Sequence, residues 1–191
     1  LYVIFSMKKQ SLAYFINKYS LNGEIDSVKW NVSKDNNLIE TSSRSDDKSV
    51  ISFVNLKDSG GLDNAELCIN DTAKLKRMVG VLGDEIDLSL NFIRPDKLSS
   101  VVFKSGKTTV QYVVADPSVI PPVPKVSNLP EFQVEIPLTP EFVSSFIKSK
   151  SALNDVNTMT FVSKDNKINL VIGYSNVNSN RINIEVVPTV G

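Results

Sequence analysis

The sequence contains no histidine, which is the commonest general base and the commonest metal ligand at neutral pH. The usual catalytic triads and zinc sites are therefore excluded. The sequence also lacks the Gly-x-x-x-x-Gly-Lys-Ser/Thr and Gly-x-Gly-x-x-Gly loops that hold nucleotide phosphates. These absences argue against an enzyme, and the sequence predicts no cofactor.

Cysteine is nearly absent, and the apolar runs are short. The single cysteine, Cys68, lies between Leu67 and Ile69, so we expect an inert, buried thiol in a reducing compartment. No apolar run is long enough to cross a bilayer, so we expect no membrane association. Residues 1–5 lack the basic start and the longer apolar region of a signal peptide and predict a strand.

Acidic clusters are the remaining candidates for a metal-binding site. Asp84, Glu85 and Asp87 lie at an expected helix-to-strand turn, and Asp46 and Asp47 form a second cluster. A Ca²⁺ or Mg²⁺ site needs several converging oxygen ligands, whereas acidic residues at a solvated turn are ordinary. We therefore expect no metal site.

Charge of neither sign is in excess, because 21 basic residues balance 21 acidic ones, and this balance by itself argues against a polyanion-binding protein. The distribution is uneven, however. Segments 6–20 and 72–83 contain basic residues and no acidic residue. If these segments form helices on one surface, that surface is basic on a neutral molecule.

Apolar periodicity predicts a repeated unit of one strand, one helix and three strands. In the first copy Ser6 is the expected N-cap, the helix ends near Asn22-Gly23, and strands follow at 27–33, 38–42 and 49–55. The buried helix face has the spacing i, i+3, i+4, i+7 and is formed by Leu12, Phe15, Ile16 and Tyr19.

The second copy has a strand at 65–69, a helix capped by Asn70-Asp71, and strands at 85–92, 98–104 and 108–114. Its buried helix face is formed by Leu75, Met78, Val79 and Leu82. The third copy has a strand at 132–138, a helix starting at Thr139-Pro140-Glu141, and strands at 158–162, 168–174 and 182–187. Its buried helix face is formed by Phe142, Val143, Phe146 and Ile147.

A Pro-rich segment separates the second copy from the third. Five prolines between Ala115 and Pro130 fix φ and remove backbone donors, so neither a helix nor a central strand runs through. The sequence thus predicts an N-terminal domain at 1–115, a connector at 116–130 and a C-terminal domain at 131–191. Val119, Ile120 and Val123 in the connector form an apolar patch for a partner peptide or pack onto the core.

The three helices combine an apolar inner face with a basic or polar outer face. A solvated surface explains one such helix, and Lys18, Lys148 and Lys150 also interact favourably with helix C-termini. Three helices with this property at the same place in a repeated unit are typical of a surface that follows a phosphate backbone without reading base sequence.

The order of these elements resembles the DNA sliding clamps, and specifically the DNA polymerase processivity factors of T-even-type tailed phages. The similarity is tightest from Thr108 to Glu185, including Ala115-Asp-Pro-Ser118, the helix at 139–150 and the segment 165–173. Segment 68–88 is similar to the second helix of the first clamp domain, and segment 6–20 fits the first helix more loosely.

The resemblance implies an α+β clamp fold: two domains of repeated strand-helix-strand units with antiparallel sheets and with helices on one face. It implies a homotrimeric ring that encircles duplex DNA, tethers DNA polymerase and is opened by an ATP-dependent clamp loader, in the cytoplasm of an infected bacterial host. By position, the DNA-facing residues implied are Lys8, Lys9, Lys18, Lys74, Lys76, Arg77, Lys148 and Lys150.

Family members have a further unit that completes the second domain, so we expect a fourth repeat beyond Gly191, where this sequence stops. Without it, the C-terminal domain at 131–191 is incomplete. The alternative left open is a β-rich viral structural or interaction protein without clamp activity.

Overall fold

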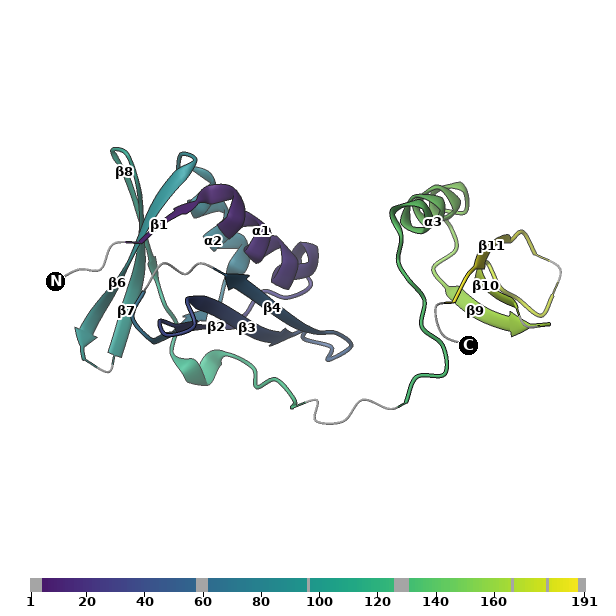
Figure 1. The fold of residues 1–191 in the computed structure, drawn as a ribbon, viewed down its shortest axis with the longest axis horizontal. Helices are drawn as coiled ribbons and strands as arrows, with labels where there is room; N and C mark the ends of the chain where they lie inside the picture. Colours follow the sequence, from purple (N-terminus) through teal and green to yellow (C-terminus); the bar gives the residue numbers. More distant parts are fainter. Residues whose placement is uncertain are drawn as a thin grey trace. The chain divides into compact units, whose positions relative to one another are not determined.

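The strand-helix-three-strand unit is the building block of the fold (Figure 1). The computed structural model describes residues 5–57, 62–95, 97–125, 131–165, 167–177 and 179–188. The chain divides into two compact units, Leu1–Lys125 and Val126–Gly191. This boundary lies inside the predicted connector, and residues 116–125 belong with the N-terminal unit.

The N-terminal unit contains two copies of the predicted repeat. The first copy comprises β1 (Phe5–Lys8), α1 (Lys9–Ser20), the short 3₁₀ helix η1 (Leu21–Gly23), β2 (Val28–Ser33), β3 (Leu38–Arg44) and β4 (Ile51–Lys57). The second comprises β5 (Ala65–Ile69), α2 (Thr72–Gly80), β6 (Glu85–Arg94), β7 (Lys97–Ser105), β8 (Thr108–Val113) and the 3₁₀ helix η2 (Pro117–Val119). The predicted repeat is confirmed here. Residues 1–4 of the predicted opening strand lie outside the described residues.

The two copies exchange their first strands. The sheets have the orders β1-β6-β7-β8 and β4-β3-β2-β5, so each sheet contains three strands of one copy and the first strand of the other. Both exchanged strands pair in the antiparallel sense, β1 with β6 and β5 with β2. Neither copy forms its complete sheet alone, so each sheet of the N-terminal unit depends on strands from both copies.

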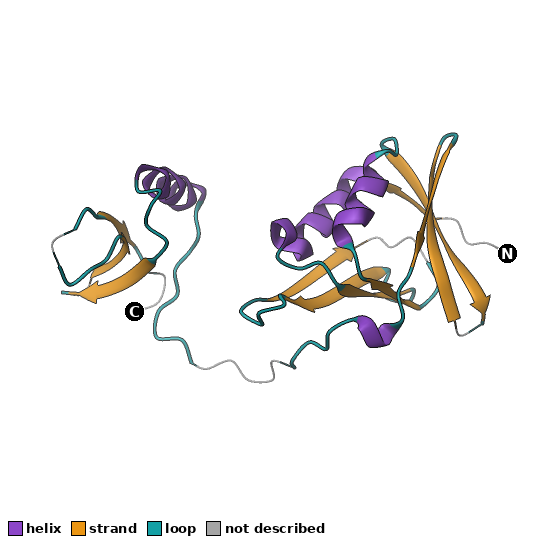
Figure 2. Cartoon of the chain, turned by 180° about the vertical axis from the view of Figure 1, so that it is seen from behind, coloured by secondary structure: helices purple, strands orange, loops and turns teal. Residues whose placement is uncertain are grey.

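The core of the N-terminal unit lies between the sheets and the two helices. α1 and α2 pack side by side, and both lie on the same side of the β4-β3-β2-β5 sheet, whereas η2 lies on its other side (Figures 1 and 2). Phe15 and Tyr19 of α1 meet Trp30 of β2 edge to face, with ring centroids 5.3–6.2 Å apart. These rings are fully buried and form the centre of the core.

The predicted start of α1 is wrong. Ser6 is not a cap but a residue of β1, paired with Asp87, and the helix begins three residues later at Lys9. Strand pairing to β6 continues through Lys8 and holds the backbone extended where the sequence alone allowed a helix. The Lys9 amide donates to the Asp84 carbonyl at 2.7 Å, so the neighbouring chain serves in place of a side-chain cap.

The predicted cap of α2 is confirmed, because the Asp71 carboxylate accepts a hydrogen bond from the Lys74 amide at 2.6 Å. We expect Asp71→Ala to lower the free energy of unfolding by about 1 kcal/mol, since one amide of the first turn loses its acceptor. Urea unfolding measures this difference. Asp71→Asn is the control, because it keeps an acceptor at the cap; an equal loss in both variants would contradict a capping role.

The C-terminal unit contains the helix and the three following strands of one further copy of the repeat. It comprises α3 (Pro140–Ala152), β9 (Met159–Lys164), β10 (Lys167–Ile172) and β11 (Ile182–Val186), with the sheet order β11-β10-β9. The predicted helix start is confirmed, because the Thr139 hydroxyl accepts a hydrogen bond from the Phe142 amide at 3.2 Å. The core is small: Phe142, Phe146, Ile136 and Ile184 pack against three buried residues, Ile168, Leu170 and Val186.

Two predictions for the C-terminal unit are wrong. Segment 132–138 forms no strand apart from an isolated bridge at Glu135, and Val143 and Ile147 are exposed rather than buried. In the N-terminal unit the strand before each helix finds its partner in the other copy. The C-terminal unit has a single copy among its described residues, so the alternating pattern at 132–138 lacks that neighbouring sheet.

Candidate nucleic-acid interface

The outward face of α2 carries three of the predicted DNA-facing residues. Lys74, Lys76 and Arg77 are all exposed, while Leu75 and Val79 on the opposite face are buried in the core. The Asp71 carboxylate lies at the N-terminus of the helix, and the helix itself contains no acidic residue. The separation of a basic face from an apolar face is therefore as the sequence predicts.

The outward face of α1 adds Lys18 and a residue that sequence reasoning missed. The Lys18 ammonium lies 5.1 Å from the centre of the Tyr14 ring, within the range of a cation–π contact. Tyr14 is exposed although it is a large aromatic residue. Its position in the sequence could have identified Tyr14, because it lies four residues before Lys18 and outside the buried apolar face. This spacing places both side chains on one face of the helix.

Lys8 and Lys9 lie at the start of α1 and differ in their surroundings. Lys8 is exposed at the end of β1, opposite Glu85 in the strand register. The Lys9 ammonium donates to the carbonyls of Gly80 at 2.8 Å and Leu82 at 2.6 Å, where the C-terminus of α2 attracts a cation. The structure thus gives Lys9 a role in joining the two helices.

The basic residues of α3 also differ. Lys148 is exposed on the outward face of the helix. The half-buried Lys150 donates to the carbonyls of Leu153 at 3.4 Å and Asn154 at 3.2 Å, which follow the end of the helix. The sequence analysis left two roles open for Lys150, DNA contact and interaction with the helix C-terminus. These hydrogen bonds are the second of them.

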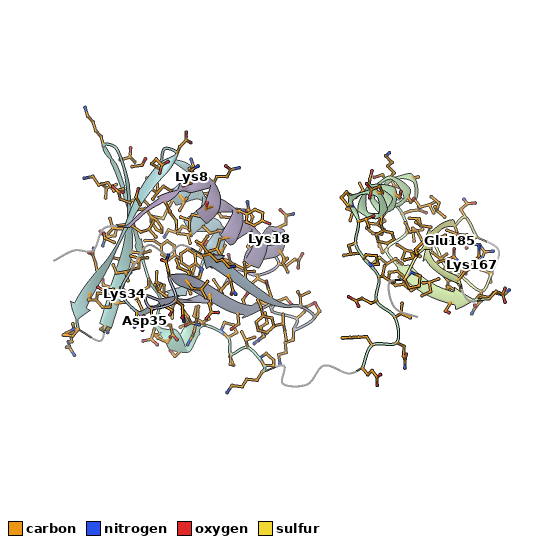
Figure 3. All side chains as sticks on the ribbon, viewed as in Figure 1. Lys8, Lys18, Lys34, Asp35, Lys167 and Glu185 are labelled. Atoms are coloured by element: carbon orange, nitrogen blue, oxygen red, sulfur yellow. The ribbon has the colours of Figure 1, made fainter. Side chains whose placement is uncertain are left out.

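Salt bridges distinguish the strand surfaces of the described chain from its helix surfaces, because they occur on the strands and their adjoining turns. The described residues contain three salt bridges, Lys29–Glu66 at 3.1 Å, Lys34–Asp63 at 2.7 Å and Lys167–Glu185 at 3.3 Å, and all are on strands or adjoining turns. Figure 3 shows Lys8 and Lys18 beside α1, and Lys34 and Asp35 on the far side of the N-terminal unit. In the described part of the chain, the lysines and the arginine of the helices form no salt bridge.

Apart from Lys9 and Lys150, the cations of the helices are exposed and, among the described residues, form no salt bridge. Their charge is therefore accessible to an anionic partner. Ammonium groups at a helix surface make sequence-independent contacts whose strength falls steeply with salt. We name the exposed cations of α1 and α2, together with Tyr14, the helical face: Lys18, Lys74, Lys76, Arg77 and Tyr14.

Asp47, in one of the two acidic clusters, has a local structural role. The Asp47 carboxylate accepts hydrogen bonds from the Ser45 hydroxyl at 2.6 Å and from the amide and hydroxyl of Ser49 at 3.0 and 2.8 Å, and these bonds lower the pKa of Asp47 to about 2. They stabilise the turn between β3 and β4. Among the described residues, no group of three or more Asp, Glu, Cys or His side chains is placed to hold a metal ion.

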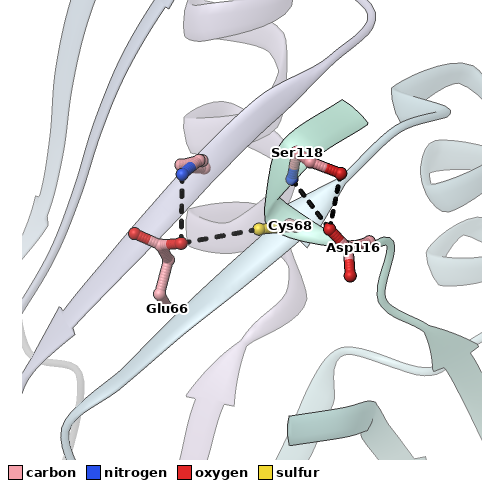
Figure 4. Close-up of polar contacts among 5 residues, drawn as sticks. Glu66, Cys68, Asp116 and Ser118 are labelled. Atoms are coloured by element: carbon pink, nitrogen blue, oxygen red, sulfur yellow. Dashed lines mark hydrogen bonds and ion pairs between the residues drawn. The ribbon is translucent and has the colours of Figure 1, made fainter. Parts of the chain in front are cut away.

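The described part of the connector, residues 116–125, packs on the N-terminal unit. The Arg44 guanidinium donates to the Pro122 carbonyl at 3.0 Å, and Asp116 caps η2 by accepting bonds from the amide and hydroxyl of Ser118 (Figure 4). Of the three predicted partner-binding residues, Ile120 is only 6% exposed, Val123 is half-buried and Val119 is exposed. The structure therefore packs Ile120 inside and leaves Val119 as the accessible member.

A cleft of about 590 Å³ lies where β5 meets the start of the connector. Its apolar lining comes mainly from the β6–β7 hairpin and the end of β8, and its polar lining includes Glu66 and Asp116. An apolar pocket with a few polar groups is the usual form of a peptide or ligand site. The lining includes Phe92, Leu98, Val114, Ala115 and Pro117.

Cys68 lies in the wall of this cleft, where burial shields its thiol. The side chain is buried, and its Sγ lies 3.8 Å from the Glu66 carboxylate (Figure 4). Burial, followed by the negative charge of Glu66, raises the pKa of Cys68 to about 11. The predicted inert, buried thiol agrees with this environment, because the thiolate is the reactive form.

We expect Cys68 to react with iodoacetamide far more slowly in the native protein at pH 8 than in urea. The raised pKa leaves only a small thiolate fraction at that pH, and the buried sulfur excludes the reagent. Mass spectrometry of timed samples measures the labelled fraction. Glutathione in the same buffers is the control for the intrinsic effect of urea. Equal rates for native and unfolded protein would contradict the buried position.

These features define the protein as one with the DNA sliding-clamp fold: repeated units, exchanged antiparallel strands and helices side by side on one face. Solved structures of sliding clamps match the chain over most of its length. The β subunit of DNA polymerase from Streptococcus pyogenes matches with a TM-score of 0.54 and 12% identity, covering 96% of this chain and 53% of that chain.

Two further structures extend the comparison. The DNA polymerase III β subunit of Thermotoga maritima matches with a TM-score of 0.61 and 12% identity, covering 88% of this chain and 46% of that one. The PCNA2–PCNA3 complex of Sulfolobus tokodaii matches with a TM-score of 0.56 and 13% identity, covering 95% and 72%. This chain thus spans about half the length of the bacterial β subunits.

No protein-family model and no curated protein sequence matches the chain. In the described residues, no helix has both the length and the apolar character needed to cross a membrane.

Proposed function

We propose that this protein is a subunit of a DNA sliding clamp, a ring that encircles duplex DNA and tethers the replicative DNA polymerase. The observation that carries the proposal is the helical face. Within the ranges that the structure describes, its cations form no salt bridge, whereas Lys29, Lys34 and Lys167 on the strands and an adjoining turn are paired with acidic residues. Positive charge is therefore available on the helices of a protein whose net charge is zero.

The inner surface of a ring must bind DNA weakly and without preference for base sequence, because a tether that moves along DNA must not bind any one site tightly. Exposed lysine side chains meet this requirement, since they contact phosphates through a flexible stem and read no base edge. Tyr14 and Lys18 offer a stacked ring and cation beside them. The helical face is accordingly the inner wall in this proposal, and Lys8 in the N-terminal unit and Lys148 in the C-terminal unit are further candidates for DNA contact.

The polymerase docks on the other side of the N-terminal unit in this proposal. The cleft beside the connector, with its mixed apolar and polar lining, and the exposed Val119 offer a docking surface beside a segment that is held by Arg44 and by the Asp116 cap. An ATP-dependent clamp loader opens the ring. The resemblance further implies a homotrimer that acts in the cytoplasm of a phage-infected bacterium.

The test compares retention on DNA molecules of different topology. The chain is assembled with a clamp loader and ATP on nicked circular DNA, free protein is removed, and half of the sample is cut with a restriction enzyme. We expect retention on the circle and rapid loss from the linear product. Linear DNA with a bulky protein block at each end is the matched control, and it should restore retention.

Equal retention on circular and open linear DNA would contradict the proposal, because contact alone would then account for binding. That result would favour the interaction-protein alternative. A polymerase extension assay on a primed circle tests the tether itself, with longer products expected when the chain is present.

A further inference from the structure

α1 and α2 bury the same pattern of positions, so their outward positions can be compared one by one. Counted from the first residue of each helix, the fourth, seventh, eighth and eleventh positions pack in the core: Leu12, Phe15, Ile16 and Tyr19 in one repeat, and Leu75, Met78, Val79 and Leu82 in the other. The sixth position is Tyr14 in α1 and Arg77 in α2, and both side chains are exposed. Two planar side-chain groups therefore lie at the same outward place in successive repeats.

The Tyr14 ring lies in solvent beside a cation. It is 62% exposed, whereas Phe15 and Tyr19 of the same helix are buried. The Lys18 ammonium lies 5.1 Å from the centre of the ring. Aromatic rings carry a large apolar area, which is stabilising when it is buried. A flat ligand that stacks on this ring would bury that area, and a phosphate of the same ligand would meet the ammonium.

Arg77 provides the second plane. Its side chain is exposed, and it forms no salt bridge with another described residue. A guanidinium group is flat and weakly hydrated, so it stacks on aromatic faces, whereas an ammonium group is a compact and strongly hydrated point charge. Arg77 thus offers a stacking surface in addition to its charge.

The form of the DNA decides whether these planes are used. In a duplex the faces of the bases are covered by their neighbours, so a protein at the surface meets phosphates, sugars and base edges. In an unpaired strand the faces of the bases are open, and they stack on aromatic side chains and on guanidinium planes. The lysines contribute to both forms through phosphate contacts. Tyr14 and Arg77 therefore contribute more to binding of the unpaired strand.

We propose that Tyr14 and Arg77 bind unpaired bases by stacking, so that the helical face holds single-stranded DNA by stacking and charge together and duplex DNA by charge alone. The inference rests on the proposed function, because it requires the helical face to contact DNA. Every base has a flat face, so the contact is independent of base sequence, as that function requires. α1 and α2 pack side by side, and packed helix axes lie about 8–10 Å apart, so one short strand reaches both planes.

The test measures the affinity of the full chain for a labelled single-stranded oligonucleotide and for the duplex of the same sequence, by fluorescence anisotropy at one salt concentration. Tyr14→Ala is expected to weaken single-strand binding by about fivefold or more, the smallest effect of removing a stacked ring, and to leave duplex binding nearly unchanged. Tyr14→Phe keeps the ring and should bind as the wild type does. Arg77→Lys keeps the charge and removes the plane, so it should also weaken binding of the single strand alone.

Phe53→Ala is the matched control for the loss of an exposed ring. Phe53 is 63% exposed, but it lies on the face of β4 opposite to Val54, which packs against the core. Phe53 is therefore on the side of the sheet away from the helices, and its removal should leave the binding of both DNA forms unchanged.

Effects of Tyr14→Ala and Arg77→Lys that are absent, or equal on the two DNA forms, would overturn the inference and leave the proposed function intact as long as the duplex binds. Failure of the wild-type chain to bind either form would contradict the proposed function together with the inference. A photoreactive base in the single strand gives a direct readout, because it should crosslink to Tyr14. Crosslinks confined to the strand surfaces would overturn the inference as well.

Discussion

Changing Lys74, Lys76 and Arg77 together to alanine is expected to cause a large loss of DNA affinity. All three side chains lie on the outward face of α2, and none forms a salt bridge with another described residue. Each phosphate contact contributes about 0.9 to the slope of log affinity against log salt concentration. Removing three contacts should lower that slope by about 2.7.

Fluorescence anisotropy of a labelled duplex at several salt concentrations measures the slope. The matched control is Lys29, Lys34 and Lys167 changed to alanine, which removes the same charge from the strand surfaces. These lysines are paired with carboxylates, and exposed pairs of this kind contribute little to stability, so the control should fold and bind normally. Equal slopes for the two variants would show that net charge, and not the helical face, governs binding.

Changing Phe15 to alanine is expected to cause a large loss of stability in the N-terminal unit. Phe15 is fully buried, and its ring meets those of Tyr19 at 5.5 Å and Trp30 at 5.3 Å. Truncating such a ring removes its buried surface and leaves a cavity, which costs about 3–5 kcal/mol. Since single domains are stable by roughly 5–15 kcal/mol, the variant should be close to unfolding at room temperature.

Urea unfolding followed by tryptophan fluorescence measures this loss, because Trp30 is the single tryptophan and reports on the N-terminal unit alone. Circular dichroism recorded in parallel checks that the change is not confined to the probe. Tyr14→Ala is the matched control: it removes an aromatic ring one residue earlier in α1, but that ring is 62% exposed, so the loss should stay within about 0.5 kcal/mol. Similar losses for both variants would contradict the packing described here.

Local chemistry explains why most elements could be predicted from the sequence. The apolar spacing of Leu12, Phe15, Ile16 and Tyr19 defines one face of a helix whatever the surrounding fold. The Asp71 and Thr139 caps depend on residues only three positions away. The basic outer face of α2 follows from the same periodicity, because a helix that buries Leu75 and Val79 must expose Lys76 and Arg77.

Errors arose where contacts between distant segments determine the structure. Ser6 has the chemistry of a cap, but pairing of β1 with β6 keeps it extended. The sequence predicts Lys9 as an exposed cation, but its ammonium donates hydrogen bonds to carbonyls at the end of α2. Both contacts join segments far apart in the sequence, so the residues next to Ser6 and Lys9 do not predict them.

The sequence by itself determined the repeated unit, the helix faces and the segregation of basic residues, because each depends on the order of neighbouring residues. The tertiary structure decided which faces are covered. Val143 and Ile147 have the same apolar pattern as their counterparts in α1 and α2, yet they stay exposed. Burial requires a second repeat and a strand exchanged with it, and the third repeat has neither among the described residues of its unit.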